Sequence, residues 1–418
     1  MKIAIIGSGI TGVTTADALL SRGHSVTVID RHPYAAMETS YANGGQLSAS
    51  NAEVWNSWET VAKGVKWMFK QNAPLLMNLR PSWHKYSWLG EFVAAIPRYR
   101  DNTAATVLLA LEARNHLFEI AEREKIDFNL EKRGILHFYH DASGFKRAER
   151  VNSLLNESGL ERRAVTNEEI RQIEPALKSD FYGGFYTPSD ATGDIHKFTS
   201  GLAHSCQRRG ATFINQALVT GLRNRDGKVT VTLAVEGGLG ASRIGVLEFD
   251  RVIVCAGVGS RQIASMVGDR VNVYPVKGYS ITVYLDDVQS QEAAPQVSLL
   301  DDAAKIVTSR LGADRFRVAG TAEFNGFNLD IRADRVKPLV DWSRHLFPGM
   351  STRRVVSWAG LRPMLPDMMP TVRKSRIPGI LYNTGHGHLG WTLSAATAQM
   401  VASLVDDVRL ADDHALAS

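Results

Sequence analysis

Apolar positions at the start of the chain follow the order strand, turn, helix, strand. The unbroken apolar run Ile3–Ile6 is typical of a parallel strand that is buried on both faces. A stripe with helical spacing runs from Ile10 to Leu20, Gly23 marks its end, and residues 25–30 form the next strand. The pattern therefore predicts a βαβ unit.

The central part of the chain follows a different pattern. Helical spacing over residues 104–125 and 143–158 encloses one strand, and three later runs are typical of long antiparallel strands. These runs cover residues 272–285, 305–310 and 315–324. They predict a second domain that is built on an antiparallel sheet.

Two further apolar strands run into glycines and so repeat the opening pattern. One leads into Cys255–Gly259, and the other leads into residues 385–390, which a helix follows. We therefore predict an α/β fold with a discontinuous Rossmann-type nucleotide-binding domain and a second α+β domain. The first domain is expected at residues 1–53, 155–272 and 352–418, and the second at residues 54–154 and 273–351.

Composition excludes several classes of protein. The 418 residues are 44% hydrophobic and 22% charged, an ordinary globular composition with room for a large ligand cavity. Lys and Arg exceed Asp and Glu by 48 to 43 without a run of five like charges, so we expect no nucleic-acid partner. Cys206 and Cys255 lack CxxC spacing and a paired histidine cluster, which argues against a disulfide framework and a metal site.

The segment 54–100 is unusual because it holds five of the eight tryptophans. Such a segment lies either at a membrane interface or against the second domain. The first strand begins at Lys2 without a leader, and no window of eighteen uncharged apolar residues occurs. We therefore expect a cytoplasmic protein, either soluble or in peripheral contact with the cytoplasmic face of the inner membrane.

A glycine motif joins the first strand to the first helix. Gly7, Gly9 and Gly12 give the spacing GxGxxG, and Asp30 ends the second strand. Glycines let backbone N–H groups approach a pyrophosphate at the positive helix N-terminus, and the carboxylate accepts hydrogen bonds from ribose hydroxyls. The set predicts a dinucleotide site, where Asp30 repels the 2′-phosphate that the neighbouring Arg31 would otherwise favour.

The two returning glycine elements favour FAD over NAD(P). A nicotinamide enzyme usually completes its nucleotide fold with contiguous βα units, whereas this chain leaves the fold early and returns twice. An NAD(P)-dependent dehydrogenase remains the alternative.

Four segments carry a resemblance to a known family. They are ETSYANGGQLS at 38–48, KGYS at 277–280, GLRPMLPD at 360–367 and NTGHGHLGWT at 383–392. With them the chain resembles the D-amino acid dehydrogenase branch of the D-amino acid oxidase family over almost its whole length. The resemblance implies a glutathione-reductase-like FAD domain and deamination of D-amino acids to 2-oxo acids. It also implies that a quinone or the respiratory chain accepts the electrons.

Small residues and glycines in two loops are the expected neighbours of the flavin, one after the second strand and one before the C-terminal helix. The second loop places a helix N-terminus where it stabilises negative charge on the flavin. The predicted FAD contacts are Gly7, Gly9, Ile10, Thr11, Gly12, Asp30, Arg31, Ser40, Asn43, Gly44, Gly45, Gln46, Leu47, Val219, Ala256, Gly257, Gly387, His388, Leu389, Gly390, Trp391 and Thr392. FAD should be held non-covalently, since Tyr41 stands where some relatives carry a linking histidine and no cysteine follows Arg362.

Arg362, in the GLRP motif, is the candidate for binding the substrate carboxylate, because a guanidinium offers a planar fork that matches a carboxylate. Its counterpart in the family has this role. Tyr279 and Arg310 are weaker candidates for substrate contact. His386 is a further candidate, for which a structural role in its loop is the alternative.

The resulting hypothesis is hydride transfer from the Cα of a small or cyclic D-amino acid, including D-proline types, to FAD and then to an acceptor other than oxygen. A peroxide-producing oxidase of the glycine or sarcosine type remains open, because oxygen access is not legible in a sequence. One departure bears on substrate size. Where the branch has a small glycine-bearing turn, this chain has Asp367–Met368–Met369–Pro370.

Overall fold

The predicted βαβ unit is confirmed in the computed structural model, which describes residues 1–67, 74–236 and 242–416. Its two strands pair in parallel, and the helix between them packs on one face. The three elements are β1 (Lys2–Ile6), α1 (Ile10–Ser21) and β2 (Ser25–Ile29).

Parallel strands extend this N-terminal sheet on both sides, in the order β19-β20-β13-β1-β2-β9. Among these described strands only β19 runs antiparallel to its neighbour. The added strands are β9 (Thr212–Ile214), β13 (Arg251–Val254), β19 (Thr371–Lys374) and β20 (Ile380–Thr384). Because β1, β13 and β20 are adjacent and parallel, the three glycine loops that follow them meet at one edge of the sheet.

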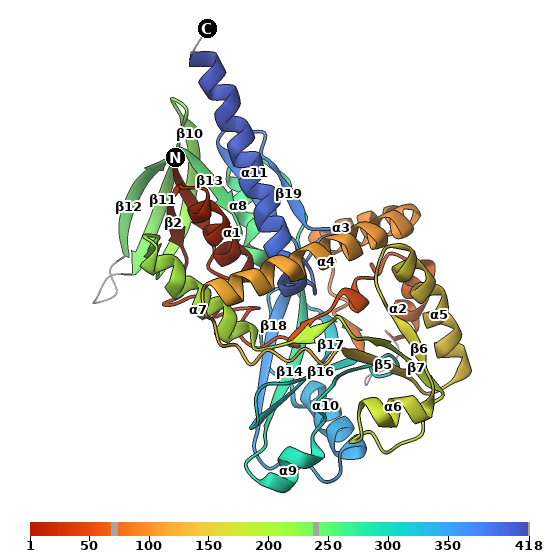
Figure 1. Cartoon of the computed structure of the whole chain (residues 1–418). Helices are drawn as coiled ribbons and strands as arrows, with labels where there is room; N and C mark the ends of the chain where they lie inside the picture. The colour runs from red at the N-terminus through yellow and green to blue at the C-terminus, as the bar shows by residue number, and fades with distance from the viewer. Residues whose placement is uncertain (68–73, 237–241, 417–418) are drawn as a thin grey trace.

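Alternate residues of these strands bury opposite faces of the N-terminal sheet. Ile3 and Ile5 pack against helices, whereas Ile6 and Val254 pack against a small antiparallel sheet. The helices are α1, α4 (Tyr99–Arg123), α7 (Ile195–Arg208) and α11 (Gly390–Leu416), and the small sheet consists of β10 (Ala217–Arg225), β11 (Lys228–Glu236) and β12 (Ser242–Phe249). Figure 1 shows these three layers around the N-terminus, with α11 running to the C-terminus.

A larger, mostly antiparallel sheet forms the other half of the molecule, as predicted, in the order β18-β14-β17-β16-β15-β5-β7-β6 with β4 beside β17. Its strands are β4 (Leu75–Met77), β5 (Ile135–Tyr139), β6 (Arg163–Val165), β7 (Gly183–Thr187), β14 (Tyr274–Tyr284), β15 (Ser298–Asp301), β16 (Ile306–Arg310), β17 (Arg315–Phe324) and β18 (Val355–Met364). Helix α10 (Ala333–Leu346) packs against β14 and β17 and covers one face of this large sheet (Figure 1). The other face is free to meet the N-terminal half.

Shorter elements connect these layers. They are β3 (Gln46–Leu47), β8 (Ala191–Thr192), α2 (Trp58–Trp67), α3 (Trp83–Ala94), α5 (Ala142–Glu157), α6 (Asn167–Ile173), α8 (Ser260–Met266), α9 (Val288–Ala293), and the 3₁₀ turns Ala49–Asn51, Ile96–Arg98 and Gly257–Gly259.

Three strands cross the predicted domain boundaries. β6, β7 and β18 belong to the large sheet, although the predicted segments 155–272 and 352–418 place them with the nucleotide-binding domain. Apolar patterning marks a strand but does not tell which sheet it joins, and here β18 pairs along β14 while β7 joins β6 to β5. The division of the remaining chain stays a prediction.

The tryptophan-rich segment 54–100 divides between the interior and the surface, except for residues 68–73, which lie outside the described part. Trp88 is buried, and its Nε1 donates a hydrogen bond to the Met364 carbonyl at 2.9 Å. Trp83, by contrast, is 81% exposed. Among the helices that the structure describes, none is both long enough and apolar enough to cross a membrane.

Candidate active site

A cavity of ≈ 830 Å³ lies between the glycine-loop edge of the N-terminal sheet and the large sheet. Every predicted cofactor contact lines it except Gly12 and Leu47, which are buried in α1 and β3. Arg362, Tyr279 and His386 line the same cavity. Elements that are remote in the sequence therefore converge on one space.

The glycine loop leaves the first turn of α1 open toward the cavity. Gly9 is the N-cap residue and has no side chain to cap the helix. The Ile10 N–H donates to the Ser40 hydroxyl at 3.0 Å, which leaves the N–H groups of Thr11 and Gly12 to a ligand. Gly7 has a φ of +107°, and a Cβ there would come within 2.5 Å of the Cys255 carbonyl oxygen. A Cβ on Gly12 would overlap the Gly7 carbonyl. The loop can hold this shape only with glycines at both positions.

Asp30 is held in place at the end of β2 by three hydrogen bonds. Its carboxylate accepts from the Ser8 N–H at 2.6 Å, the Ser8 hydroxyl at 2.8 Å and the His32 N–H at 2.8 Å. The carboxylate also lines the cavity, where it is placed to accept from ribose hydroxyls. Arg31 instead pairs with Glu38, so its charge is compensated within the chain.

The loop after β2 is fastened to the large sheet. The hydroxyls of Ser280 and Ser309 donate to the carbonyls of Ala42 and Gly44, both at 2.6 Å. A Cβ on Gly44 would come within 2.8 Å of the Val307 side chain. The backbone of this loop therefore lies directly against the large sheet, with no room for a side chain at Gly44.

The C-terminal loop closes another side of the cavity. Gly385 and Gly387 have φ values of +79° and +58°, and a Cβ on Gly385 would overlap the side chain of Leu365. The loop leads directly into α11, whose N-terminus therefore directs its positive end at the cavity.

These features fit FAD. The first turn of α1 suits a pyrophosphate, and Asp30 suits a ribose. The glycine loops after β2 and before α11 present backbone to the cavity where larger side chains would occupy the space for the flavin.

Arg362 presents a guanidinium without an ionic partner among the described residues. It lies on β18 and rests on Gly278, where a Cβ would overlap its Nη1. Its printed hydrogen bond is a long one of 3.4 Å, from Nη1 to the Thr321 carbonyl. Burial lowers the pKa of Arg362 to about 10, so the side chain remains a cation at neutral pH. A guanidinium that lines a cavity and has N–H donors to spare is suited to bind a carboxylate.

His388 and Trp55 form a stacked pair beside this guanidinium. Their ring centroids are 4.6 Å apart and their planes 24° apart, and both rings line the cavity. Nε2 of His388 lies 3.3 Å from the Asn51 carbonyl. The sequence predicts His388 as a cofactor contact but gives no sign of its partner Trp55.

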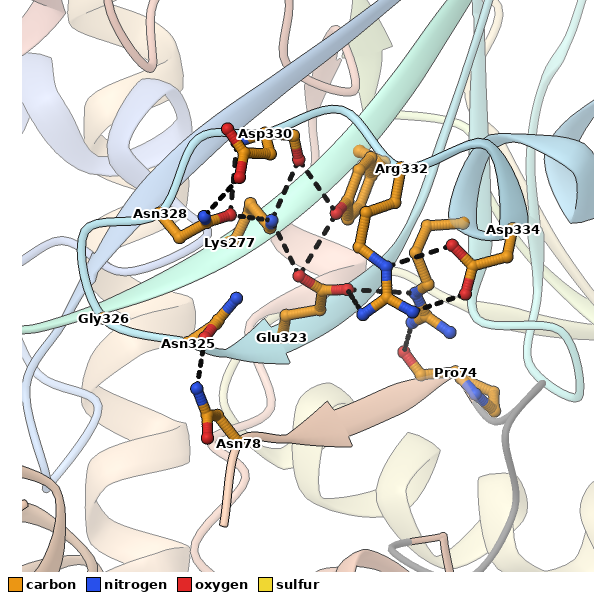
Figure 2. A network of polar contacts seen from close by, with 12 residues as sticks. Pro74, Asn78, Lys277, Glu323, Asn325, Gly326, Asn328, Asp330, Arg332 and Asp334 are labelled. Atoms are coloured by element: carbon orange, nitrogen blue, oxygen red, sulfur yellow. Dashed lines mark hydrogen bonds and ion pairs between the residues drawn. The ribbon is translucent and has the colours of Figure 1, made fainter. Parts of the chain in front are cut away.

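Tyr279 directs its hydroxyl into a buried ionic network behind the cavity wall. The hydroxyl donates to Glu323 at 3.1 Å, and Glu323 also pairs with Lys277 at 2.8 Å. Lys277 donates in turn to Asn328 and to the Asp330 carbonyl, as Figure 2 shows. The hydroxyl therefore has a structural partner, and the prediction that Tyr279 contacts substrate is not supported by its hydrogen bonds.

Arg310 does not face the cavity. Its guanidinium donates to the carbonyls of Gly312 at 2.9 Å and Ala313 at 2.7 Å, so it holds the turn between β16 and β17. The structure therefore does not support the predicted substrate contact of Arg310, because its donors are used by backbone carbonyls and it is absent from the cavity lining.

His386 takes the structural role that was the alternative for it. It is buried, and its Nε2 lies 2.8 Å from the Thr397 hydroxyl of α11. Burial lowers the pKa of His386 to about 4, so the ring is neutral at physiological pH.

The methionine pair that departs from the family pattern packs away from the cavity. Met368 is 6% exposed and belongs to an apolar cluster with Trp88 and Phe324. Met369 packs against the same cluster. The bulk of this turn therefore fills the apolar cluster, and neither methionine lines the cavity.

Sequence reasoning missed a polar part of the cavity wall. Tyr99 donates to Glu53 at 2.6 Å, and the Ser50 hydroxyl lies 3.0 Å from His137 Nε2. Arg162 is buried there, and its Nε has no hydrogen-bond partner in the described part of the chain. These residues come from α4, β5, the 3₁₀ turn Ala49–Asn51 and two loops, so no local motif marks them, although Ser50 closely follows the ETSYANGGQLS segment.

The chain is similar to curated proteins over almost its whole length. "D-amino acid dehydrogenase 3" of Mesorhizobium japonicum is 63% identical over 404 residues, covering 97% of each chain. "D-amino acid dehydrogenase" of Dechloromonas aromatica is 37% identical over 417 residues, covering 98% of each.

Solved structures with low identity share the fold. Glycine oxidase from Bacillus cereus superposes with a TM-score of 0.70 at 21% identity, covering 97% of this chain and 95% of that one. L-proline dehydrogenase from P. horikoshii gives 0.74 at 16% identity, covering 97% and 92%. The model of a family described as FAD dependent oxidoreductase matches residues 2–404. This chain therefore belongs to the FAD-dependent oxidoreductase family that includes the D-amino acid oxidases.

Proposed function

We propose that the protein is an FAD-dependent D-amino acid dehydrogenase that acts on small or cyclic D-amino acids. The observation that carries the proposal is the guanidinium of Arg362, which has no ionic partner among the described residues and lines the cavity beside the loops that fit FAD. The names of the two relatives, at 63% and 37% identity over almost the full length, support the same activity.

The reaction needs a bound carboxylate, an exposed Cα–H and a hydride acceptor. FAD, when bound, supplies the acceptor. Arg362 binds the carboxylate and thereby fixes the Cα, while the Cα–H bond breaks as the amine lone pair forms a C=N bond. Water then converts an acyclic imino acid to a 2-oxo acid and ammonia, whereas a cyclic substrate such as D-proline gives a cyclic imino acid that keeps its nitrogen.

FAD is held non-covalently in this proposal. Cys255 lines the cavity, but burial raises the pKa of its thiol to about 12, so it remains protonated and unreactive at neutral pH. The positive N-terminus of α11 favours negative charge at the flavin edge during reduction.

The electron acceptor in this proposal is a quinone of the cytoplasmic membrane face, or another component of the respiratory chain. The support is an exposed apolar rim, which we define as Leu79, Trp83, Phe327, Leu329 and Ile331. Asn78 and Asn325 join its two segments by a hydrogen bond of 2.7 Å. Arg80, exposed beside Leu79, suits an anionic phospholipid surface. Leu75, four residues before Leu79, lines the cavity, so the rim lies next to the active site.

The decisive experiment is anaerobic titration of the flavin. D-Alanine and D-proline should bleach its absorption, and the L-enantiomers should not. Arg362→Lys should lower kcat/KM by about 100-fold while FAD content stays constant, because the bidentate contact is lost although the charge remains. Reduction by glycine or sarcosine but by no D-amino acid would contradict the proposal, and stoichiometric peroxide in air would identify an oxidase.

A further inference from the structure

His388 occupies a position that the cofactor alone does not explain. It lines the cavity next to Arg362, whose positive charge acts on its ring. Stacking on Trp55 at 4.6 Å fixes the plane of the imidazole. The ring is thus a rigid group on the wall where the substrate carboxylate is expected.

The hydrogen bond to Asn51 determines which nitrogen carries the proton. A carbonyl oxygen only accepts, so Nε2 of His388 is the donor in this contact of 3.3 Å. In a neutral ring the proton-free nitrogen is then Nδ1. Among the described residues no hydrogen bond to Nδ1 is formed.

The surroundings keep the ring neutral. Burial, and after it the positive charge of Arg362, lowers the pKa of His388 to about 4. At neutral pH Nδ1 therefore carries a lone pair and no proton.

We propose that Nδ1 of His388 accepts a hydrogen bond from the amino group of the substrate while Arg362 binds its carboxylate. This inference rests on the proposed function and adds an amine subsite to it. Two fixed points restrict rotation of the substrate, so that one Cα–H, and hence one enantiomer, meets the flavin. A ligand with a carboxylate and no amine would use Arg362 alone.

Three substitutions separate this role from simple packing. His388→Phe keeps an aromatic ring on Trp55 but removes both nitrogens. His388→Asn places an amide oxygen near the position of Nδ1, whereas His388→Gln reaches toward the position of Nε2. D-Alanine and propionate are matched probes, because they differ only in the amine. Anaerobic stopped-flow reduction gives the Kd of D-alanine, and flavin absorption changes give the Kd of propionate.

We expect His388→Phe to raise the Kd of D-alanine at least tenfold and to change that of propionate less than twofold. His388→Asn should restore most D-alanine affinity, and His388→Gln should not. Arg362→Lys should weaken both ligands.

Equal weakening of both ligands by His388→Phe, or no weakening of either, would overturn the amine subsite. Rescue by His388→Gln but not by His388→Asn would overturn it as well. If no D-amino acid reduces the unaltered holoenzyme, the proposed function fails and this inference fails with it. FAD content per chain, measured for each variant, shows that the fold is intact.

Discussion

The charge state of the Asp269 carboxylate depends on the hydrogen bonds that it accepts from three neighbouring side chains. Burial alone raises the pKa of Asp269, but hydrogen bonds from Ser375, Arg376 and Tyr382 outweigh it and lower the pKa to about 2. The bonds from Arg376 and Tyr382 measure 2.9 and 2.8 Å, and the side chain is 1% exposed. A depressed pKa in the folded state means that the charged form stabilises the fold above the unfolded pKa.

We therefore predict an acid-dependent loss of stability at this position. The pKa difference corresponds to about 2 kcal/mol of unfolding free energy at neutral pH, falling to about half of that near pH 3. Asp269→Asn should show its full destabilisation at pH 7, and the difference from the unaltered protein should shrink as pH falls toward 2. Urea unfolding at pH 7, 5, 4 and 3 measures it.

Asp226→Asn is the matched control, because its side chain is 91% exposed and Asn tolerates its φ of +52°. Its effect should stay below about 0.5 kcal/mol at each pH. A difference for Asp269→Asn that stays constant with pH would contradict the account.

Residue roles that depend on near neighbours in the sequence could be predicted, and those that depend on distant partners could not. Gly12 is constrained by the Gly7 carbonyl a few residues before it, so the local spacing predicts this contact, whereas Gly7 also lies against the remote Cys255 carbonyl. The stacking of His388 on Trp55, by contrast, depends on packing between opposite ends of the chain. The alternation of side chains along a strand likewise does not show that Arg310 binds the Gly312 carbonyl or that Tyr279 binds Glu323.

At the scale of elements, the entry into α1 depends on contact between its first turn and the preceding loop. Gly12 lies inside the helix, where an alanine would ordinarily be favoured, but its Cβ would overlap the Gly7 carbonyl. The helix and the loop therefore accept only glycine at this contact.

We predict that Gly12→Ala loses bound FAD and lowers the unfolding free energy by about 2 kcal/mol, because the helix must move away from the loop. Gly90→Ala in α3 is the control, since a Cβ there meets nothing within 4 Å and should stabilise the protein by up to about 1 kcal/mol. Thermal unfolding and the ratio of flavin to protein absorption measure both. Retention of FAD by Gly12→Ala would contradict this account.

At the scale of the whole molecule, the apolar rim is formed by two segments that belong to different parts of the chain. Leu79 and Trp83 are 73% and 81% exposed, and Phe327 is 61% exposed. Exposed aromatic side chains beside an arginine are typical of a surface that contacts lipid headgroups.

The triple variant Leu79→Ser, Trp83→Ser and Phe327→Ser should reduce binding to vesicles of anionic phospholipid more than tenfold, because the buried apolar area is lost. Its reduction of a soluble dye with D-alanine should be unchanged. Cosedimentation measures binding. The control variant replaces three other exposed apolar residues with serine, namely Leu218, Ile244 and Val246 of the small sheet, which are 50%, 79% and 60% exposed. Equal loss of binding in the control would show that the rim is not a specific surface.

The order of strands in the N-terminal sheet has a consequence for biosynthesis. Three loops of the cavity follow β1, β13 and β20, and β20 starts only at Ile380. A ribosome therefore makes the first two loops long before the third. A nascent chain that has not yet reached residues 385–390 lacks one wall of the flavin site, so we expect FAD to bind only after this loop has been synthesised.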